Sequence, residues 1–219
     1  MFIKLTPTLQ ETSEPPNEIP YRAELLRKSL HLIALIIPVG MFYLGRETAL
    51  YILVPLSIFA ISIEYLRTRS ETTARFIDRT FGWMMRTRER TVVGSPFTIN
   101  GATWVVLSAT ILALIFPIQV ASFALGSFMI SDAGAALAGR RFGRHHWGVS
   151  KKTMEGSLVF FILATLCLLC FDALTFVEAA GVAFIAMLLE IAPLPFNDNL
   201  YVPFGIAGLI YLLNPGLAV

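Results

Sequence analysis

A single carboxylate, Asp132, lies within a long apolar stretch, residues 120–138. A charged side chain at the centre of a membrane costs roughly 2.5–3.5 kcal/mol on insertion scales, so it usually lines a cavity and serves a function. A glycine-rich and basic segment, residues 139–156, follows directly. Glycines let a ligand approach the backbone closely, and basic side chains attract phosphate. This combination predicts chemistry on a nucleotide or another phosphorylated substrate at a bilayer surface.

The residues that follow Asp132 on a helix could serve binding or packing. Asp132 shares one predicted helical face with four small residues: Ala135, Ala136, Gly139 and Gly143. Small side chains let a ligand or a neighbouring helix come close to the backbone. Gly139, Arg140 and Gly143 are therefore candidate contacts with a phosphorylated ligand. The alternative is a packing seam in which Asp132 is hydrogen-bonded across the helix interface.

The start of the next predicted helix is suited to phosphate. Ser150 or Thr153 is expected to cap this helix, because their hydroxyls accept hydrogen bonds from first-turn N–H groups. The helix would then present free backbone N–H groups and the positive end of its dipole to phosphate. Lys151 and Lys152 add positive charge, or alternatively only anchor the chain on the cytoplasmic side. Thr153 and Gly156 are further candidate contacts with the nucleotide.

Two further carboxylates could hold Mg²⁺ together with Asp132. Glu155 either complements the dipole of the helix that begins beside it or holds a Mg²⁺ that bridges phosphates. Asp198 lies in a break between two predicted helices, residues 193–199, where it either caps the second helix or acts as an oxygen ligand. Glu190, just before the break, is a weaker candidate. Mg²⁺ typically takes one or two carboxylates and completes its shell with substrate phosphates.

Charged residues near the ends of the first two apolar segments share helical faces. Arg27, Lys28 and His31 lie close together on one predicted face, and Glu64 and Arg67 form an i, i+3 pair. Arg27, Lys28 and His31 are candidate contacts with a nucleotide. The alternative for both groups is simple anchoring of the helix ends at the membrane interface.

The composition identifies the elements that must position these groups. Hydrophobic residues make up 56% of the 219 residues and charged residues only 15%, against roughly 25% in soluble domains. Mean hydropathy is +0.70, which excludes an ordinary soluble domain. The net charge of +2 is too balanced to indicate nucleic acid as a partner. We predict a loose polar tail over residues 1–20 and one integral-membrane catalytic domain over residues 21–219.

Seven apolar segments predict an all-α fold, a polytopic membrane bundle of about seven transmembrane helices. Several of their apolar cores are shorter than the roughly 20 residues that a helix needs to cross a membrane alone. This predicts helices whose polar ends reach a shared aqueous site. The segments cover about residues 30–45, 48–66, 100–117, 119–139, 156–172, 174–191 and 200–214.

The positive-inside rule orients this bundle. Lysines and arginines are concentrated before the first segment, between the second and third, and between the fourth and fifth. With seven spans these regions all face the cytoplasm, so the N terminus is expected inside and the C terminus outside. The small size and the lack of a targeting sequence favour a bacterial inner membrane as the location. Between the second and third segments, residues 67–95 predict a cytoplasmic amphipathic helix in the headgroup layer. Its basic and apolar residues lie on opposite sides: Arg75, Arg79, Arg86 and Arg90 against Ile77, Phe81, Met84 and Met85.

Five motifs stand in order across nearly the whole chain: Arg27-Lys28-x-x-His31, Glu64-x-x-Arg67, Ser131-Asp132-x-x-Ala135-x-x-x-Gly139-x-x-Phe142-Gly143, Lys152-Thr153-x-Glu155-Gly156-Ser157 and Asp198-Asn199-x-x-x-Pro203. This ordered set resembles the polyprenol kinase family, which includes dolichol kinase, phytol kinase and CTP-dependent diacylglycerol kinase. The resemblance implies a cytosol-facing site that uses CTP and Mg²⁺ to phosphorylate the hydroxyl of a membrane lipid alcohol. It does not identify the alcohol.

Residues 131–156 are also similar to phosphatidate cytidylyltransferases, which attack CTP at its α-phosphate to make CDP-diacylglycerol. Those enzymes carry a C-terminal signature with Lys-Asp, Gly-His-Gly-Gly and Asp-Arg elements, whereas this chain has no Lys, Arg or His after Lys152. The missing signature favours the kinase. One departure from the family pattern counts against the kinase, because members of the kinase family often show two acids where this chain has Asn197-Asp198.

For the kinase, Asp132, Lys152 and Glu155 are the catalytic candidates. Lys151, Lys152 and the helix start would hold the phosphates, and Asp132, with Asp198 or Glu155, would hold Mg²⁺. Asp132 is alternatively the base that orients the attacking hydroxyl. The expected partners are CTP, the lipid alcohol and the bilayer, and the chain could form a homo-oligomer. A small membrane transporter is the non-enzyme alternative, although transporters place ionisable groups near the middle of the membrane.

Overall fold

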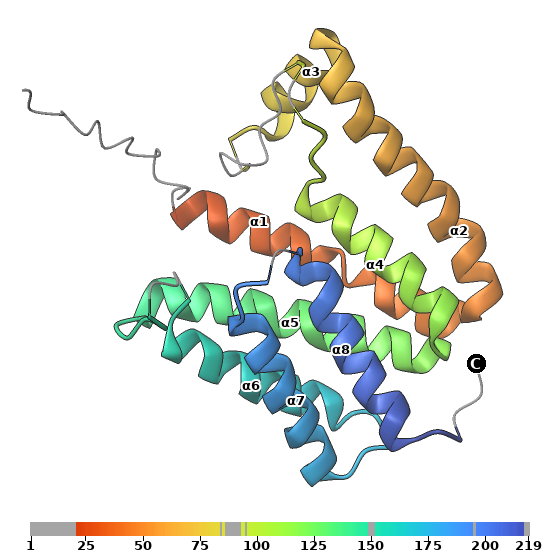
Figure 1. The fold of residues 1–219 in the computed structure, drawn as a ribbon, viewed down its shortest axis with the longest axis vertical. Coiled ribbons are helices and arrows are strands. Elements are labelled where there is room, and N and C mark those ends of the chain that lie inside the picture. The colour runs from red at the N-terminus through yellow and green to blue at the C-terminus, as the bar shows by residue number, and fades with distance from the viewer. Residues whose placement is uncertain are drawn as a thin grey trace, which may run out of the picture.

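The structure is a computed structural model that describes residues 21–83, 85, 93–94, 96–148, 152–194 and 196–216. In these residues the regular structure is helical, and extended pairing is limited to one isolated β-bridge between His146 and Thr153. This confirms the predicted all-α class, whereas the predicted tail over residues 1–20 lies outside the described residues. The helices of the described chain (Figure 1) are α1 (Tyr21–Ile33), α2 (Ile36–Arg69), α3 (Glu71–Phe81), α4 (Gly101–Ile115), α5 (Ile118–Phe142), α6 (Met154–Leu168), α7 (Phe176–Ile191) and α8 (Asp198–Leu213).

All seven predicted apolar segments are largely helical, and the first two are joined within one helix. The first segment runs from the end of α1 into α2, and the second is the remainder of α2. Inside α2, Gly45 has a φ of 76° and a ψ of 170°, which interrupts the helix in a backbone conformation open to glycine. The chain turns sharply there, so that the parts of α2 before and after Gly45 form a V (Figure 1).

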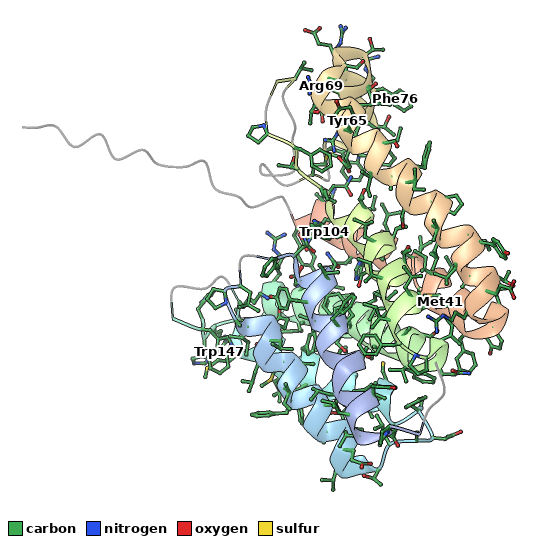
Figure 2. All side chains as sticks on the ribbon, turned by 45° about the vertical axis from the view of Figure 1, so that its right-hand side comes forward. Met41, Tyr65, Arg69, Phe76, Trp104 and Trp147 are labelled. Carbon is green, nitrogen blue, oxygen red and sulfur yellow. The ribbon has the colours of Figure 1, made fainter. Side chains whose placement is uncertain are left out.

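Among the described residues, two helical stretches are long and apolar enough to cross a membrane: Tyr21–Arg69 and Ile118–Phe142. Helices α4, α6 and α8 are apolar but shorter. Large apolar side chains, among them Tyr43, Tyr51 and Phe59, are exposed along α2, and Figure 2 shows side chains projecting outward along this helix. An exposed apolar surface of this extent is typical of a face that meets lipid or another protein. These features suggest association with a membrane.

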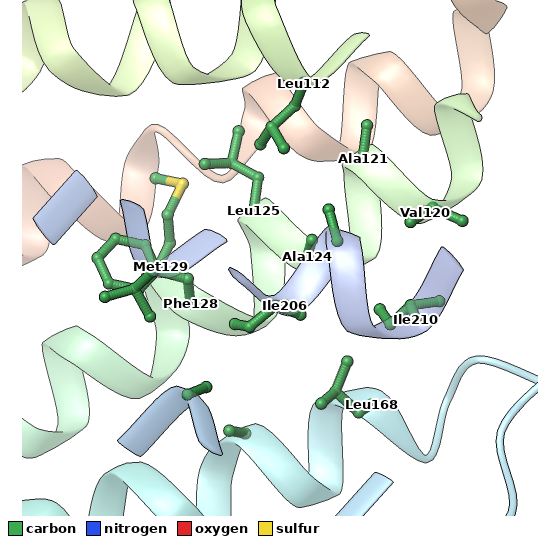
Figure 3. Close-up of a cluster of buried hydrophobic side chains, with 14 of the residues drawn as sticks. Leu112, Val120, Ala121, Ala124, Leu125, Phe128, Met129, Leu168, Ile206 and Ile210 are labelled. Carbon is green, nitrogen blue, oxygen red and sulfur yellow. The ribbon is translucent and has the colours of Figure 1, made fainter. Parts of the chain in front are cut away.

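The core is built around α5. Its residues Ala121, Ala124, Leu125, Phe128 and Met129 are completely buried. Small residues let the neighbouring helices approach α5 closely, and the large ones fill the space between them. Because α5 is held from several sides, the position of Asp132 in its second half is fixed relative to the other helices. The same cluster includes residues of α4, α6 and α8: Leu112, Leu168, Ile206 and Ile210 (Figure 3).

The amphipathic helix expected between the second and third apolar segments is present as α3, but it is shorter than predicted. Ser70 caps its start by accepting a hydrogen bond from the Thr73 N–H, and the helix ends at Phe81. Arg75 and Arg79 are exposed, as predicted, and Ile77 is half-buried. Three other residues of the prediction lie outside the described residues: Met84, Arg86 and Arg90.

Candidate functional site

A polar cavity lies at one end of the bundle, where α1, α6 and α8 begin and α5 and α7 end. Its volume is about 610 Å³. Asp132, Lys152 and Asp198, which come from three distant parts of the sequence, therefore share one cavity. Gly139, Arg140, Gly143, Thr153 and Gly156 also line it. Among the described residues its Asp, Glu, Lys and Arg side chains are Glu24, Lys28, Asp132, Arg140, Lys152, Glu190 and Asp198.

Asp132 is paired with Lys28 across the interface between α5 and α1. The Lys28 Nζ donates a hydrogen bond to Asp132 Oδ2, and His31 Nε2 lies 3.6 Å from the same oxygen. The Lys28 side chain is 6% exposed and that of Asp132 is 15% exposed. A charge this deeply buried requires a partner, which explains why the two side chains meet. Asp132 is thus hydrogen-bonded across the helix interface, as the packing-seam alternative predicts, and it also lines the polar cavity.

Lys152 joins the loop before α6 to the end of α7. Its Nζ lies 2.8 Å from Glu190 Oε1 and also donates to the Glu190 carbonyl oxygen. A cation at the C-terminal end of a helix is favoured by the helix dipole. Glu190, a weaker candidate on sequence grounds, therefore lies in the cavity beside Lys152. Lys151, the second predicted phosphate contact of this loop, lies outside the described residues.

The start of α6 is capped as predicted, but its N–H groups are not free. Thr153 accepts a hydrogen bond from the Gly156 N–H at 3.2 Å. The Met154 N–H donates to the His145 carbonyl oxygen at 2.8 Å. The prediction of free N–H groups for phosphate was therefore wrong at these two positions, because the preceding loop folds back on the helix. Any phosphate in this cavity must be held mainly by side chains.

Glu155 lies beside the cavity and does not line it. Its carboxylate accepts hydrogen bonds from the Arg144 N–H at 3.1 Å and from His145 Nδ1 at 2.8 Å. Together with a hydrogen bond from its own backbone, the His145 contact lowers the pKa of Glu155 to about 2. Glu155 is thus anionic at neutral pH and holds the loop that precedes α6. Its predicted roles in catalysis and metal binding are not favoured by this placement.

Asp198 lines the cavity from the first turn of α8. The residue before it, Asn197, caps the helix by accepting a hydrogen bond from the Asn199 N–H at 3.0 Å. The expectation that Asp198 is the cap was therefore wrong, since the chain enters the helix one residue earlier. The Asp198 carboxylate accepts one bond from the same N–H group, at 3.1 Å, and makes no ion pair within the described chain.

The donor set fits a Mg²⁺ that arrives with a phosphorylated substrate. In the part of the chain that the structure describes, no group of three or more His, Cys, Asp or Glu residues is arranged to hold a metal ion. Mg²⁺ does not need such a group, because it often binds through one or two carboxylates and substrate phosphates. Asp198 and Asp132 supply carboxylate oxygens in the same cavity.

Glu24 is a cavity residue that the sequence reasoning missed. It is buried on α1, and its carboxylate lies 2.7 Å from Arg27 and 4.0 Å from Arg140. Glu24 therefore connects the start of α1 to the basic end of α5. The available signal was its position three residues before Arg27, which places both side chains on one helical face.

Glu64 and Arg67 are far more buried than membrane-interface anchors would be. Their side chains are 2% and 1% exposed, and Arg67 Nη1 donates to Glu64 Oε2 at 2.7 Å. The other oxygen of Glu64 accepts a bond from the Thr103 hydroxyl at 3.2 Å. The pair therefore connects α2 to α4. The anchoring interpretation is wrong for these two residues.

Three glycines keep α5 and α6 close together beside the cavity. A Cβ atom on Gly156 would lie 2.8 Å from the Ala135 carbonyl oxygen, and one on Gly139 would lie 2.8 Å from Thr153 Oγ1. A Cβ atom on Gly143 would lie 2.5 Å from Thr153 Cγ2. The predicted close approach to the small residues of α5 is thus made by helix α6 and its capping residue Thr153.

Gly156→Ala is expected to destabilise the protein by about 1–3 kcal/mol, because the new methyl group meets backbone that cannot move aside cheaply. The matched control is Gly208→Ala in α8, where a Cβ atom would meet nothing within 4 Å. That change should leave stability equal or higher by up to about 1 kcal/mol, since alanine favours helices. Thermal unfolding in detergent measures both. Equal stability of the two variants would contradict the packing role of Gly156.

The chain has a distant similarity to a known protein. No protein-family profile matches it. The uncharacterized protein RP860 of Rickettsia prowazekii (strain Madrid E) is 24% identical over 141 residues, which cover 64% of this chain and 67% of that protein. No solved structure matches. The comparisons thus leave the activity to be inferred from the cavity.

Proposed function

We propose that this protein is an integral-membrane kinase that transfers the γ-phosphoryl group of CTP to the hydroxyl of a lipid alcohol. The observation that carries the proposal is the polar cavity, which combines Asp132 with Lys28, Arg140, Lys152 and Asp198. Phosphoryl transfer depends mainly on positioning and on neutralisation of phosphate charge. A cavity that gathers cations and carboxylates at one end of an apolar bundle supports that chemistry.

The membrane arrangement is part of the same proposal. The seven apolar segments form seven spans, the N terminus is cytoplasmic, and the C terminus is on the outer side of a bacterial inner membrane. The charge asymmetry of the loops supports this orientation. The start of α1, the end of α5 and the start of α6 form much of the polar cavity and adjoin basic segments, so the cavity faces the cytoplasm, where CTP is present.

The charges of the cavity explain why a metal ion would accompany the nucleotide. Its described lining has four carboxylates and three Lys or Arg side chains, and those cations already lie near carboxylates. These side chains alone do not neutralise a triphosphate. Asp198 and Asp132 are the residues that would hold Mg²⁺, which when bound neutralises phosphate charge. Lys152 and Arg140, which line the same cavity, would contact the phosphates.

The reaction forms one P–O bond and breaks two bonds, one P–O bond of CTP and the O–H bond of the lipid hydroxyl. The oxygen of the lipid hydroxyl attacks the γ-phosphorus, the bond from that phosphorus to the β–γ bridging oxygen breaks, and CDP leaves. Asp132 accepts the hydrogen bond of the attacking hydroxyl, orients it, and takes up its proton as the bond to phosphorus forms. Lys28, held beside Asp132, keeps that carboxylate in place.

The decisive experiment uses CTP labelled at either the α- or the γ-phosphate, with purified protein and a panel of polyprenol, phytol, diacylglycerol and phosphatidate in vesicles. Label from the γ position is expected in an alcohol, and addition of EDTA should remove the activity. Label from the α position in phosphatidate would instead identify a cytidylyltransferase. No transfer to any lipid would refute both enzymes.

A further inference from the structure

A second cavity lies next to the polar cavity, among α1, α2, α3 and α4. Its volume is about 390 Å³, within the usual range of ligand pockets, about 300–1,000 Å³. Lys28 lines both cavities, and the start of α8 reaches both, through Asp198 in the first and Asn199 in the second. Its apolar lining includes Leu30, Ala34, Ile37, Ile63, Val105 and Val106. We call this space the apolar cavity.

The charged groups of the apolar cavity already have partners in the protein. Arg27 is paired with Glu24, Lys28 with Asp132, and Arg67 with Glu64. A ligand with a charged group in this cavity would have to compete with those pairs or leave its own charge unpaired in an apolar site, which is costly. A neutral ligand with a hydrocarbon part faces neither cost.

One buried polar atom at the junction of the two cavities lacks a hydrogen-bond partner among the residues that the structure describes. His31 lines the apolar cavity, and its Nε2 is buried without a hydrogen-bond partner within the described chain. It lies 3.6 Å from Asp132 Oδ2, and Asp132 lines the polar cavity. Buried polar groups are normally hydrogen-bonded, so an unsatisfied atom at this place indicates a group supplied by a ligand. A hydroxyl that donates to Asp132 and accepts from His31 would satisfy it.

We infer that the apolar cavity binds the hydrocarbon segment next to the hydroxyl of the acceptor, and that His31 and Asp132 hold that hydroxyl where the two cavities meet. The inference rests on the proposed kinase and specifies its acceptor as an uncharged alcohol. The phosphates of the donor occupy the polar cavity on the other side of Asp132. A phosphatidate headgroup does not match this arrangement, because its phosphate would bring a second negative charge next to the Asp132 carboxylate where the two cavities meet.

The test fills the apolar cavity without touching the charged residues. Val106→Phe places a larger side chain in its wall, and Ala102→Phe, at an exposed lining position, is the second variant should the first fail to fold. Val177→Phe is the matched control, since Val177 lies on α7, is 77% exposed and lines neither cavity. The KM for the alcohol is expected to rise at least 10-fold in a cavity variant, with the KM for CTP unchanged and the control unaffected.

A binding readout separates this inference from the proposed function. The probe is a long-chain primary alcohol with a diazirine close to its hydroxyl, crosslinked to the protein in vesicles and mapped by mass spectrometry. Crosslinks are expected on α1 and α4, are competed by unlabelled alcohol, and fall at least 10-fold in the cavity variants. Crosslinks confined to the outer face of α2, or equal in all variants, would overturn the inference. Crosslinks in the cavity without any γ-phosphoryl transfer would refute the kinase and leave the alcohol site standing.

Discussion

Asp132→Asn is expected to lower γ-phosphoryl transfer at least about 100-fold, because the amide cannot take up the proton of the attacking hydroxyl. The same change also removes the negative charge of the Asp132 carboxylate, a proposed Mg²⁺ ligand, from the polar cavity. The measurement is the rate of label transfer from γ-labelled CTP at saturating lipid. Activity within a few-fold of the original protein would show that Asp132 has no part in the chemistry.

The pairing of Asp132 with Lys28 requires a separate control for folding. Removing one partner of a fully buried pair costs about 3–5 kcal/mol, and the cost here is smaller because Asp132 is 15% exposed. The double variant Lys28→Met/Asp132→Asn removes the unpaired cation, so part of the lost stability is expected to return. Activity should stay absent in the double variant. If stability recovers and activity does not, the role of Asp132 in phosphoryl transfer is separated from its role in pairing with Lys28.

The helices and their polar ends could be predicted from the sequence because both follow from the alternation of apolar segments with charged loops. Apolar segments of similar length must lie side by side, and the basic residues cluster in alternate loops. Asp132, Lys152 and Asp198 were therefore expected at one end of the bundle, and they line one cavity. The cap at Thr153 follows from local chemistry alone.

The pairings between helices could not be predicted, because they depend on how each helix is rotated about its axis. Lys28 and Asp132 are far apart in the sequence, and no local rule selects Lys28 over Arg27 as the partner. The cap of α8 shows a local limit, since Asn197 and Asp198 are equally good capping residues. Only the path of the chain into the helix decides between them.

The loop before α6 shows how a correct local prediction led to a wrong functional one. A capped helix start was expected to offer N–H groups to phosphate. The loop instead folds back, so that His145 accepts from the Met154 N–H and Glu155 binds the backbone of Arg144. Such contacts depend on the path of the loop between the two helices. Helix capping rules describe the helix end and do not include them.

Arg67→Ala is expected to produce the largest loss of stability of any single change proposed for this protein. Arg67 and Glu64 are 1% and 2% exposed, and removal of the guanidinium leaves the Glu64 carboxylate buried without its cation. Breaking such a pair costs about 3–5 kcal/mol. The loss should also loosen α3, because Arg67 Nη2 lies 3.9 Å from Asp78 Oδ1. Thermal unfolding in detergent, followed by circular dichroism, measures the effect.

The matched control is the neighbouring pair on α3, Glu71 and Arg75. These side chains are 76% and 75% exposed and lie 3.7 Å apart, so Arg75→Ala should change stability by less than about 1 kcal/mol. The double variant Glu64→Gln/Arg67→Met removes both charges and should be more stable than Arg67→Ala alone, since no buried charge is left unpaired. If Arg67→Ala instead unfolds at the same temperature as Arg75→Ala, the pair has no structural role. Glu64 and Arg67 would then have to be explained by ligand binding, because they also line the apolar cavity.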